Sequence, residues 1–409
     1  VVSAGGVNVT GSDLSTTGGA TDSIEIEADA GNVQITAEEA ISLTSRVGDQ
    51  APDDADINIR GDVTSAEGAI SARATGDVLV RATMTTSLTG SGITLTGDEG
   101  NSGSGGVHVH ADGAIASAGG VTLTGAQLID NPNATTDSIL IAQDANQIVA
   151  RDAIALNAST ATQAPDDANI QILGDVTSSS GTITVDATGD AVVGGTVKTD
   201  LTGNGVTITA DRSNTGVGGV QVAMAGQIDS AGGVTLVGSD YANTDNSIVV
   251  EADGGNEQIL AKQNISLRSS TATEAPDDGH IDIDGDIRST QGTIDVAASG
   301  DVLVDAGLNP DTTGRDITLT GDQGDSGAGG VAIGASAAID SAGEVNLTGA
   351  DVAGTAADTD SVTIAAGAAI TARDAIQVSS STADLAPDDA FISVLGNLTS
   401  TNGAIDLQQ

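Results

Sequence analysis

Residues 51–63 read Ala-Pro-Asp-Asp-Ala-Asp-Ile-Asn-Ile-Arg-Gly-Asp-Val, and close copies of this stretch begin at Ala164, Ala275 and Ala386. The copies are spaced 113, 111 and 111 residues apart. A second marker, Ser-Ala-Gly-Gly/Glu-Val, recurs in phase with the first. Repeats of fixed length are typical of solenoids and arrays. We therefore predict one continuous solenoid over 1–409, with repeat units at 3–116, 117–229, 230–340 and, truncated, 341–409.

Each unit contains a finer period of apolar-x-apolar triplets. Alternation of this kind predicts strands with one buried face, and the Gly, Asp, Ser and Thr between the triplets favour turns. The predicted fold is all-β: a right-handed parallel β-helix (β-solenoid) with about 20–26 short coils, ~4.8 Å apart, and essentially no helix. A β-propeller is the alternative, but its longer blades and aromatic signatures are not seen. In the first unit the triplets begin at Val7, Ile24, Ile41, Ile57, Val78, Ile93 and Val107.

The rare large side chains indicate what kind of core this solenoid has. The chain has no Cys or Trp, and one Tyr and one Phe, Tyr241 and Phe391. Because aromatic residues normally fill the core of a globule, their scarcity predicts a narrow aliphatic core. Disorder is disfavoured because the β-branched residues alternate regularly. One position lies just before an inward isoleucine in every unit, so we expect it to point outward; its occupants are Asp56, Asn169, His280 and Phe391.

The charge balance excludes some partners. Twelve Lys and Arg face 57 Asp and Glu, a net charge of −45. This field repels nucleic acid and anionic lipid and attracts cations. We expect no required cofactor, with Ca²⁺ or other cations screening the surface. No run of 18 or more apolar residues occurs, so we expect no membrane insertion in this segment.

A Gly- and Asp-rich corner at residues 98–106, repeated at 211–219 and 322–330, is the leading candidate site. Carboxylate, amide and backbone oxygens crowded in one loop can coordinate Ca²⁺. A tight turn that needs positive φ explains the glycines equally well. The candidate Ca²⁺ ligands are Asp98, Asn101, Asp211, Asn214, Asp322 and Asp325.

Two further features are candidates for binding. One loop varies in length between units and carries isolated apolar residues, which suggests partner contact, although drift in a tolerant loop is the alternative. His108 and His110 share one outward strand face and could hold a transition metal, but they do not recur in other units and are more simply surface residues. The loop residues are Leu14, Leu128, Ile129, Tyr241 and Val352.

Several strings carry a family resemblance. Residues 61–70 read Gly-Asp-Val-Thr-Ser-Ala-Glu-Gly-Ala-Ile, residues 119–125 read Gly-Gly-Val-Thr-Leu-Thr-Gly, and residues 396–405 repeat the first string with changes. They resemble the filamentous-haemagglutinin-like exoproteins of two-partner secretion and similar giant repetitive adhesins. The resemblance implies a secreted, right-handed β-helical fibre that holds partners or surfaces at a distance.

From these observations we expect a structural component of an extracellular filament, fibre or stalk, located at the cell surface. Without recognisable caps at its ends, the chain reads as an excerpt of a longer array. The alternative is the repetitive spacer of an adhesin that attaches cells to each other or to surfaces. Expected partners are other copies of the chain, side by side or end to end, and a cell surface or glycans. A polysaccharide-active β-helix enzyme is a remote alternative, because a basic residue suited to proton abstraction is scarce: Lys occurs twice, at Lys198 and Lys262.

Overall fold

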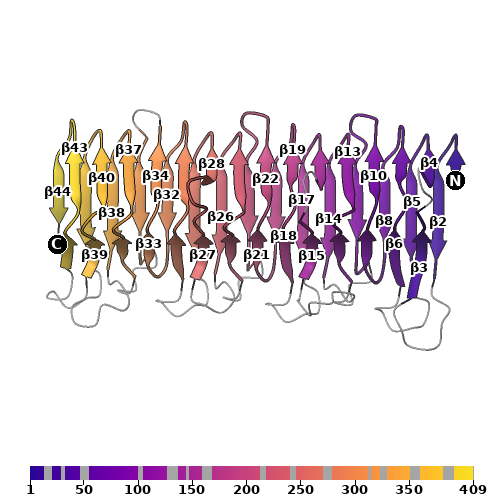
Figure 1. Cartoon of the computed structure of the whole chain (residues 1–409), viewed down its shortest axis with the longest axis horizontal. Helices are drawn as coiled ribbons and strands as arrows, with labels where there is room; N and C mark the ends of the chain where they lie inside the picture. The colour runs from indigo at the N-terminus through magenta and orange to yellow at the C-terminus, as the bar shows by residue number, and fades with distance from the viewer. Residues whose placement is uncertain are drawn as a thin grey trace. The chain divides into compact units, whose positions relative to one another are not determined.

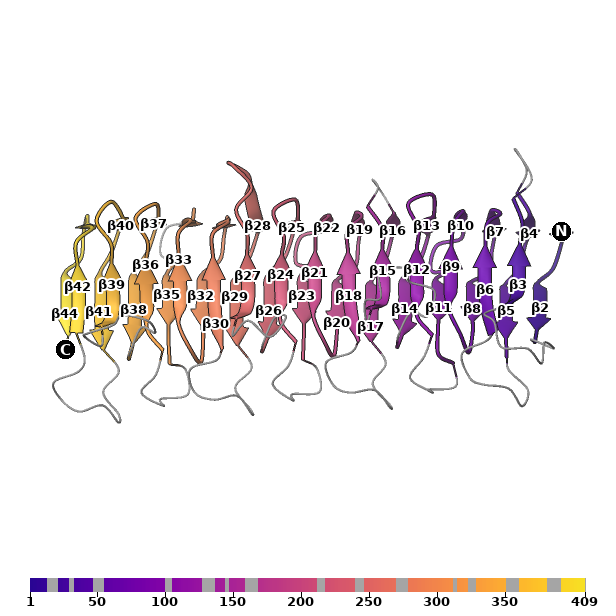
Figure 2. The same ribbon diagram turned by 60° about the horizontal axis from the view of Figure 1, so that its bottom comes forward.

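The computed structural model divides the chain into two compact units, Val1–Asn204 and Gly205–Gln409. All described regular structure is β-strand, and each unit contains three parallel sheets, A, B and C (Figures 1 and 2). The parallel β-solenoid predicted from the sequence is thereby confirmed. The described residues are 1–12, 21–28, 33–46, 55–99, 105–126, 137–143, 147–158, 168–211, 218–239, 246–269, 279–311, 315–322, 329–350, 360–380 and 391–408.

In the first unit the chain runs through sheets A, B and C in turn, and each strand pairs with the strand three positions later. Sheet A contains β1 (Val2–Ser3), β4 (Ile35–Ala37), β7 (Val63–Ser65), β10 (Thr83–Thr86), β13 (Ala114–Ser117), β16 (Ile148–Ala150), β19 (Val176–Ser178) and β22 (Thr196–Thr199). Sheet B contains β2 (Val7–Gly11), β5 (Ile41–Ser45), β8 (Ile70–Arg73), β11 (Ile93–Thr96), β14 (Val121–Gly125), β17 (Ile154–Ala158) and β20 (Ile183–Asp186). Sheet C contains β3 (Thr21–Ile26), β6 (Ala55–Ile59), β9 (Val78–Val80), β12 (Val107–Val109), β15 (Asp137–Ile141), β18 (Asn169–Ile172) and β21 (Ala191–Val193).

The second unit follows the same rule. Its sheet A contains β25 (Gln227–Ser230), β28 (Glu257–Ala261), β31 (Asp286–Ser289), β34 (Gly307–Pro310), β37 (Ala338–Ser341), β40 (Ala369–Ala372) and β43 (Asn397–Ser400). Its sheet B contains β23 (Val206–Thr209), β26 (Val234–Gly238), β29 (Ile265–Ser269), β32 (Ile294–Ala297), β35 (Ile317–Thr320), β38 (Val345–Gly349), β41 (Ile376–Ser380) and β44 (Ile405–Gln408). Its sheet C contains β24 (Val220–Val222), β27 (Asn246–Val250), β30 (His280–Ile283), β33 (Val302–Val304), β36 (Val331–Ile333), β39 (Asp360–Ile364) and β42 (Phe391–Val394).

The coils are longer and fewer than the sequence suggested. The 44 described strands, three to a coil, make between 14 and 15 coils, so the expected 20–26 is wrong. Each repeat contains four coils, because the serine that opens the second marker recurs every twelve strands, in β1, β13, β25 and β37. The triplets that we counted lie in sheets B and C. Strands of sheet A were missed because many end on Ala or Ser, as in Ile35–Ala37 and Val63–Ser65.

The core is aliphatic, as predicted. Side chains at equivalent positions stack from coil to coil; Ile93, for example, lies in register between Ile70 and Val121. All three are at most 1% exposed. Phe391 is 44% exposed, which confirms that this side chain points outward.

The corner between sheets A and B is closed by serine and glycine. Ser178 donates a hydrogen bond from Oγ to the carbonyl oxygen of Asp152 (2.7 Å) and accepts one from the N–H of Gly181 (2.9 Å). Gly181 lies so close to the preceding coil that a Cβ would be 2.1 Å from the backbone nitrogen of Ala153. Ser65 and Gly68 repeat this arrangement one repeat earlier. The serine therefore satisfies backbone groups that the turn leaves unpaired.

The corner before sheet C is closed by carboxylates that accept backbone N–H groups, an arrangement that we call a bracket. The Asp56 carboxylate accepts a hydrogen bond from the N–H of Asp77 (2.7 Å), and Asp77 accepts one from the N–H of Gly106 (2.8 Å). Asp56 is only 2% exposed, so the expected outward direction is wrong there. The pairing register of β3 and β6 shifts between Asp22 and Ile24 of β3, beside Asp56. Asn169 and His280 play the same part at the equivalent positions, accepting the N–H groups of Asp190 and Asp301 at 2.7 Å.

Candidate functional site

The candidate Ca²⁺ ligands that the structure describes are buried turn residues. Asp98, Asp211 and Asp322 are 5%, 3% and 4% exposed, with φ of 56°, 48° and 56°. The Asp211 carboxylate accepts a hydrogen bond from the Ser239 hydroxyl at 2.7 Å. Within the described residues, no group of three or more His, Asp or Glu is placed to hold a metal ion. The positive φ supports the turn interpretation of this corner, and the Ca²⁺ sites stay a prediction.

The remaining predicted site residues lie outside the described residues. They comprise the other three candidate ligands and the whole partner-contact loop: Asn101, Asn214, Asp325, Leu14, Leu128, Ile129, Tyr241 and Val352.

His108 and His110 point to the same side of β12, as predicted, and their rings stack with centroids 3.5 Å apart. Burial, and secondarily nearby charge from Arg81, lowers the pKa of His108 to about 4. Burial, His108 and Arg81 lower the pKa of His110 to about 3. Both imidazoles are therefore neutral at pH 7. The neighbouring guanidinium disfavours a bound cation, so the pair resembles a packed edge of the sheet more than a metal site.

Arg60 and Arg81, which we call the basic patch, occupy adjacent coils of sheet C in the first unit. Each directly follows the last residue of its strand, β6 or β9, and its N–H continues the ladder, at 2.9 and 2.7 Å. Arg60 forms an ion pair with Glu25 at 2.9 Å. Within the described residues, the Nε of Arg81 has no hydrogen-bond partner. Half of the Arg60 side chain, 49%, is exposed.

An acidic patch, defined as Glu251, Asp282, Asp284 and Asp305, lies on sheet C of the second unit. Glu251, Asp284 and Asp305 directly follow β27, β30 and β33, the position that the arginines take in the first unit. Burial, with repulsion from Asp284 and Asp305, raises the pKa of Asp282. Burial, with repulsion from Asp305 and Glu251, raises the pKa of Asp284. These carboxylates therefore carry unbalanced negative charge close together.

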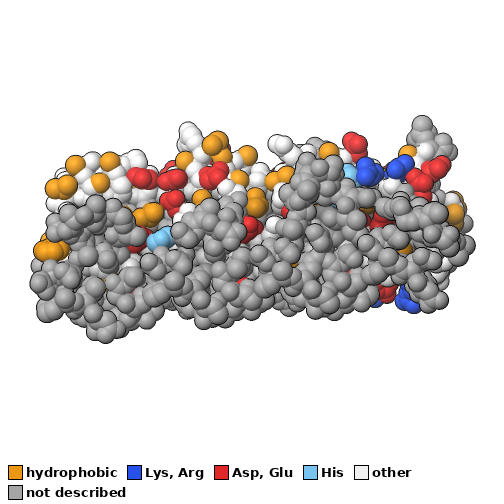
Figure 3. Space-filling model, turned by 90° about the horizontal axis from the view of Figure 1, so that it is seen from below, with side chains coloured by type: hydrophobic (Ala, Val, Ile, Leu, Met, Phe, Trp, Pro, Cys, Tyr) orange, Lys and Arg blue, Asp and Glu red, His pale blue; other side chains and the backbone are white. Residues whose placement is uncertain are grey.

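Figure 3 shows one face of the molecule with its charged side chains coloured. Blue side chains lie together at one place, with pale blue and red ones beside them, and elsewhere red side chains lie without blue neighbours. Sequence analysis missed both patches, although the signal is present. When the four repeats are aligned, the residue after the second inward apolar position is Arg60, Leu173, Asp284 and Leu395. The charge at this position therefore changes sign between the first and third repeats.

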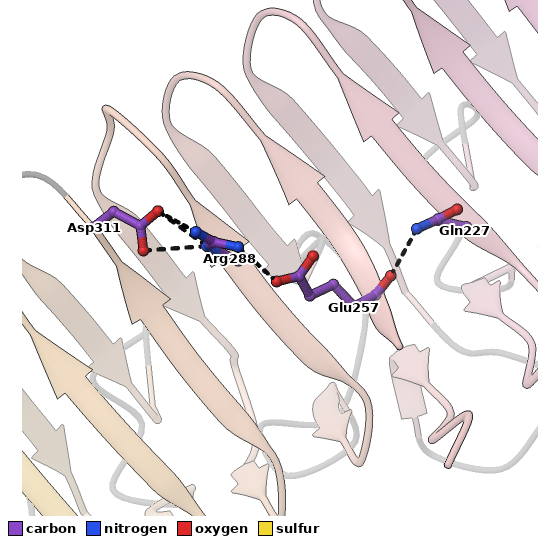
Figure 4. Close-up of polar contacts among 4 residues, drawn as sticks. All are labelled: Gln227, Glu257, Arg288 and Asp311. Carbon is purple, nitrogen blue, oxygen red and sulfur yellow. Dashed lines mark hydrogen bonds and ion pairs between the residues drawn. The ribbon is translucent and has the colours of Figure 1, made fainter. Parts of the chain in front are cut away.

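A third charged group joins three successive coils of sheet A (Figure 4). Arg288 Nη1 lies 2.9 Å from a carboxylate oxygen of Glu257, and Nη2 lies 2.6 Å from one of Asp311. Hydrogen bonds to Asp311 and Glu257 raise the pKa of Arg288 further above its usual range. Glu257 also accepts, at its backbone oxygen, a hydrogen bond from Gln227 (3.2 Å). One guanidinium is shared by two carboxylates, and the cluster ties three coils together.

No family model, curated protein or solved structure matches the chain. In the part of the chain that the structure describes, no helix has the length and apolarity that a bilayer crossing requires.

Proposed function

We propose that the chain is a structural segment of an extracellular filament, fibre or stalk. The observation that carries the proposal is the repetition of the same coil chemistry. Sheet B columns such as Ile70–Ile93–Val121 bury the core. In successive repeats the corners are closed by serine hydroxyls and by a side-chain oxygen of Asp56 or Asn169. Such a coil can be added indefinitely, since each one presents to the next the backbone ladder that it received.

The acidic surface supports an exterior location for this segment. A net charge of −45 keeps neighbouring chains soluble, and calcium- or salt-rich surroundings screen it. The resemblance to filamentous-haemagglutinin-like exoproteins points the same way. In the alternative, a spacer within a cell-surface adhesin, the same coils separate a recognition domain from the cell, and the ligand is bound elsewhere.

Gold-labelled antibodies against residues 117–229, applied to intact cells that produce the protein, test the proposal. Label spaced along surface filaments is the expected result for a filament component. Label confined to short projections would favour the adhesin spacer, and label only inside lysed cells would overturn both. Incubation of the purified chain with acidic and neutral polysaccharides tests the remote enzymatic alternative, since release of new reducing ends would contradict a purely structural role.

A further inference from the structure

The basic and acidic patches occupy matching positions and have opposite charge. In both units the patch residues other than Asp282, which lies within β30, directly follow strands of sheet C, so their side chains leave the backbone at the same place in the coil. Adjacent parallel strands set the spacing, about 4.8 Å per coil, and this spacing is common to both units. Two arginines on neighbouring coils are therefore spaced to meet two carboxylates on neighbouring coils.

Glu25 neutralises Arg60 of the basic patch, but the rest of each patch has no partner of opposite charge among the described residues. Arg81 forms no ion pair with another described residue, and its closest column neighbours are Arg60 and His110. In the acidic patch, Asp284 and Asp305 are exposed. Burial, with repulsion from Asp305 and Glu251, raises the pKa of Asp284. A positive charge placed beside these carboxylates would relieve that repulsion.

One half-buried apolar side chain adjoins the acidic patch, and another lies two coils away from Arg81 on the sheet of the basic patch. Leu140 pairs in register with His108 in the first unit, and Leu303 pairs with Asp282 in the second, each at an outward position of sheet C. A contact between the two surfaces would therefore bury apolar area as well as pair charges, the combination found in specific interfaces.

We propose that the basic patch of one copy of the chain binds the acidic patch of a second copy. This inference rests on the proposed structural function and names a surface through which filaments or stalks associate side by side. The net charge of −45 opposes association at long range, but at physiological ionic strength charges beyond about 8 Å are screened, so the local complementarity decides. The contact is heterologous, so one copy can engage two others and the association need not stop at a dimer.

Sedimentation velocity and light scattering of the 409-residue chain at 0.15 M NaCl test the proposal. Arg81→Glu and Asp284→Arg each place like charges opposite one another, and each should weaken self-association at least about tenfold. Arg373→Glu, at the exposed position after β40, and Asp340→Arg, at an exposed position of β37, lie outside the patches and make the same changes in net charge. Both should leave association as it is in the wild type.

Mixing supplies the sharper test. An equimolar mixture of the R81E and D284R variants contains one intact basic patch and one intact acidic patch, so the mixture should associate although neither variant does alone. The double variant R81E/D284R should regain self-association. Circular dichroism of each variant shows that loss of association is not loss of folding.

Two results would overturn the inference. The wild-type chain could stay monomeric throughout, or it could associate with R81E and D284R behaving like their controls. Neither result bears on the proposed structural function, which the cell-surface labelling experiment tests independently of this contact.

Discussion

The bracket formed by Asp56 gives the sharpest local prediction. Its carboxylate is 2% exposed and accepts the backbone N–H of Asp77 at 2.7 Å, and Asp77 is itself fully buried. Asp56→Ala leaves that N–H without this acceptor, at a cost of about 1–3 kcal/mol. Asp56→Asn keeps an acceptor oxygen in place, as the natural Asn169 does at the equivalent position, where Oδ1 accepts from Asp190 at 2.7 Å. We therefore expect D56A to destabilise this corner and D56N to be nearly neutral.

Hydrogen exchange followed by mass spectrometry measures the effect where it occurs. A repeat array need not unfold in one step, so a single unfolding midpoint would average over many coils. A loss of about 2 kcal/mol corresponds to roughly 30-fold faster exchange in peptides that contain the amide of Asp77. Peptides containing Asp190, one repeat later, serve as the internal control and should not change. Equal exchange in D56A and the wild type, or equally fast exchange in D56N and D56A, would refute the bracket.

Three further predictions concern the histidine pair, the arginine cluster and a corner glycine. Burial lowers the pKa of His108 to about 4 and that of His110 to about 3, below the unfolded value of 6.5. The stability that the neutral histidines contribute is therefore present above about pH 6.5 and lost as the pH falls toward 3. In H108Q/H110A, which carries the side chains of the next repeat, the thermal midpoint should fall less between pH 7 and pH 4 than in the wild type, and an identical fall would contradict this. Arg288→Ala should lower the stability of its coils by only about 1 kcal/mol, because the ion pairs are surface-exposed, and the loss should shrink in 1 M NaCl. Local hydrogen exchange measures the loss; a loss that does not depend on salt would instead indicate lost packing. Gly181→Ala forces a Cβ against the backbone of the preceding coil, whereas the Cβ of Gly5→Ala meets nothing within 4 Å. Only G181A should therefore accelerate hydrogen exchange in its own and the preceding coil. Unchanged exchange in G181A would show that the coils are less closely stacked.

The sequence predicted the features that depend on strict periodicity. Triplets such as Ile57-Asn58-Ile59 identified strands and their inward faces, because a strand buried on one side must alternate. The absence of Trp and near absence of other aromatics indicated the aliphatic core. Phe391 was placed outside correctly: it is 44% exposed, in the last strand of sheet C.

Other features depend on what polar residues do inside corners, which alternation does not report. Sheet A was undercounted because Ser65 and its equivalents face inward as hydrogen-bonding groups. Asp56 was misplaced because its carboxylate accepts the backbone N–H of Asp77 in the next coil, a contact that alternation does not report. The charge patches were missed because the stacking of coils brings Arg81 and Asp305 next to their charged neighbours, and those neighbours are distant in the sequence.

The central claim is that each repeat of about 112 residues adds four three-stranded coils to a solenoid of constant cross-section. Small-angle scattering and cryo-electron microscopy of the chain with one, two or three extra copies of residues 117–229 inserted in series test it directly. Each added copy is expected to lengthen the particle by about 19 Å, four coils at the strand spacing, with an unchanged cross-sectional radius. An increment near 30 Å, or a cross-section that grows with each copy, would contradict it.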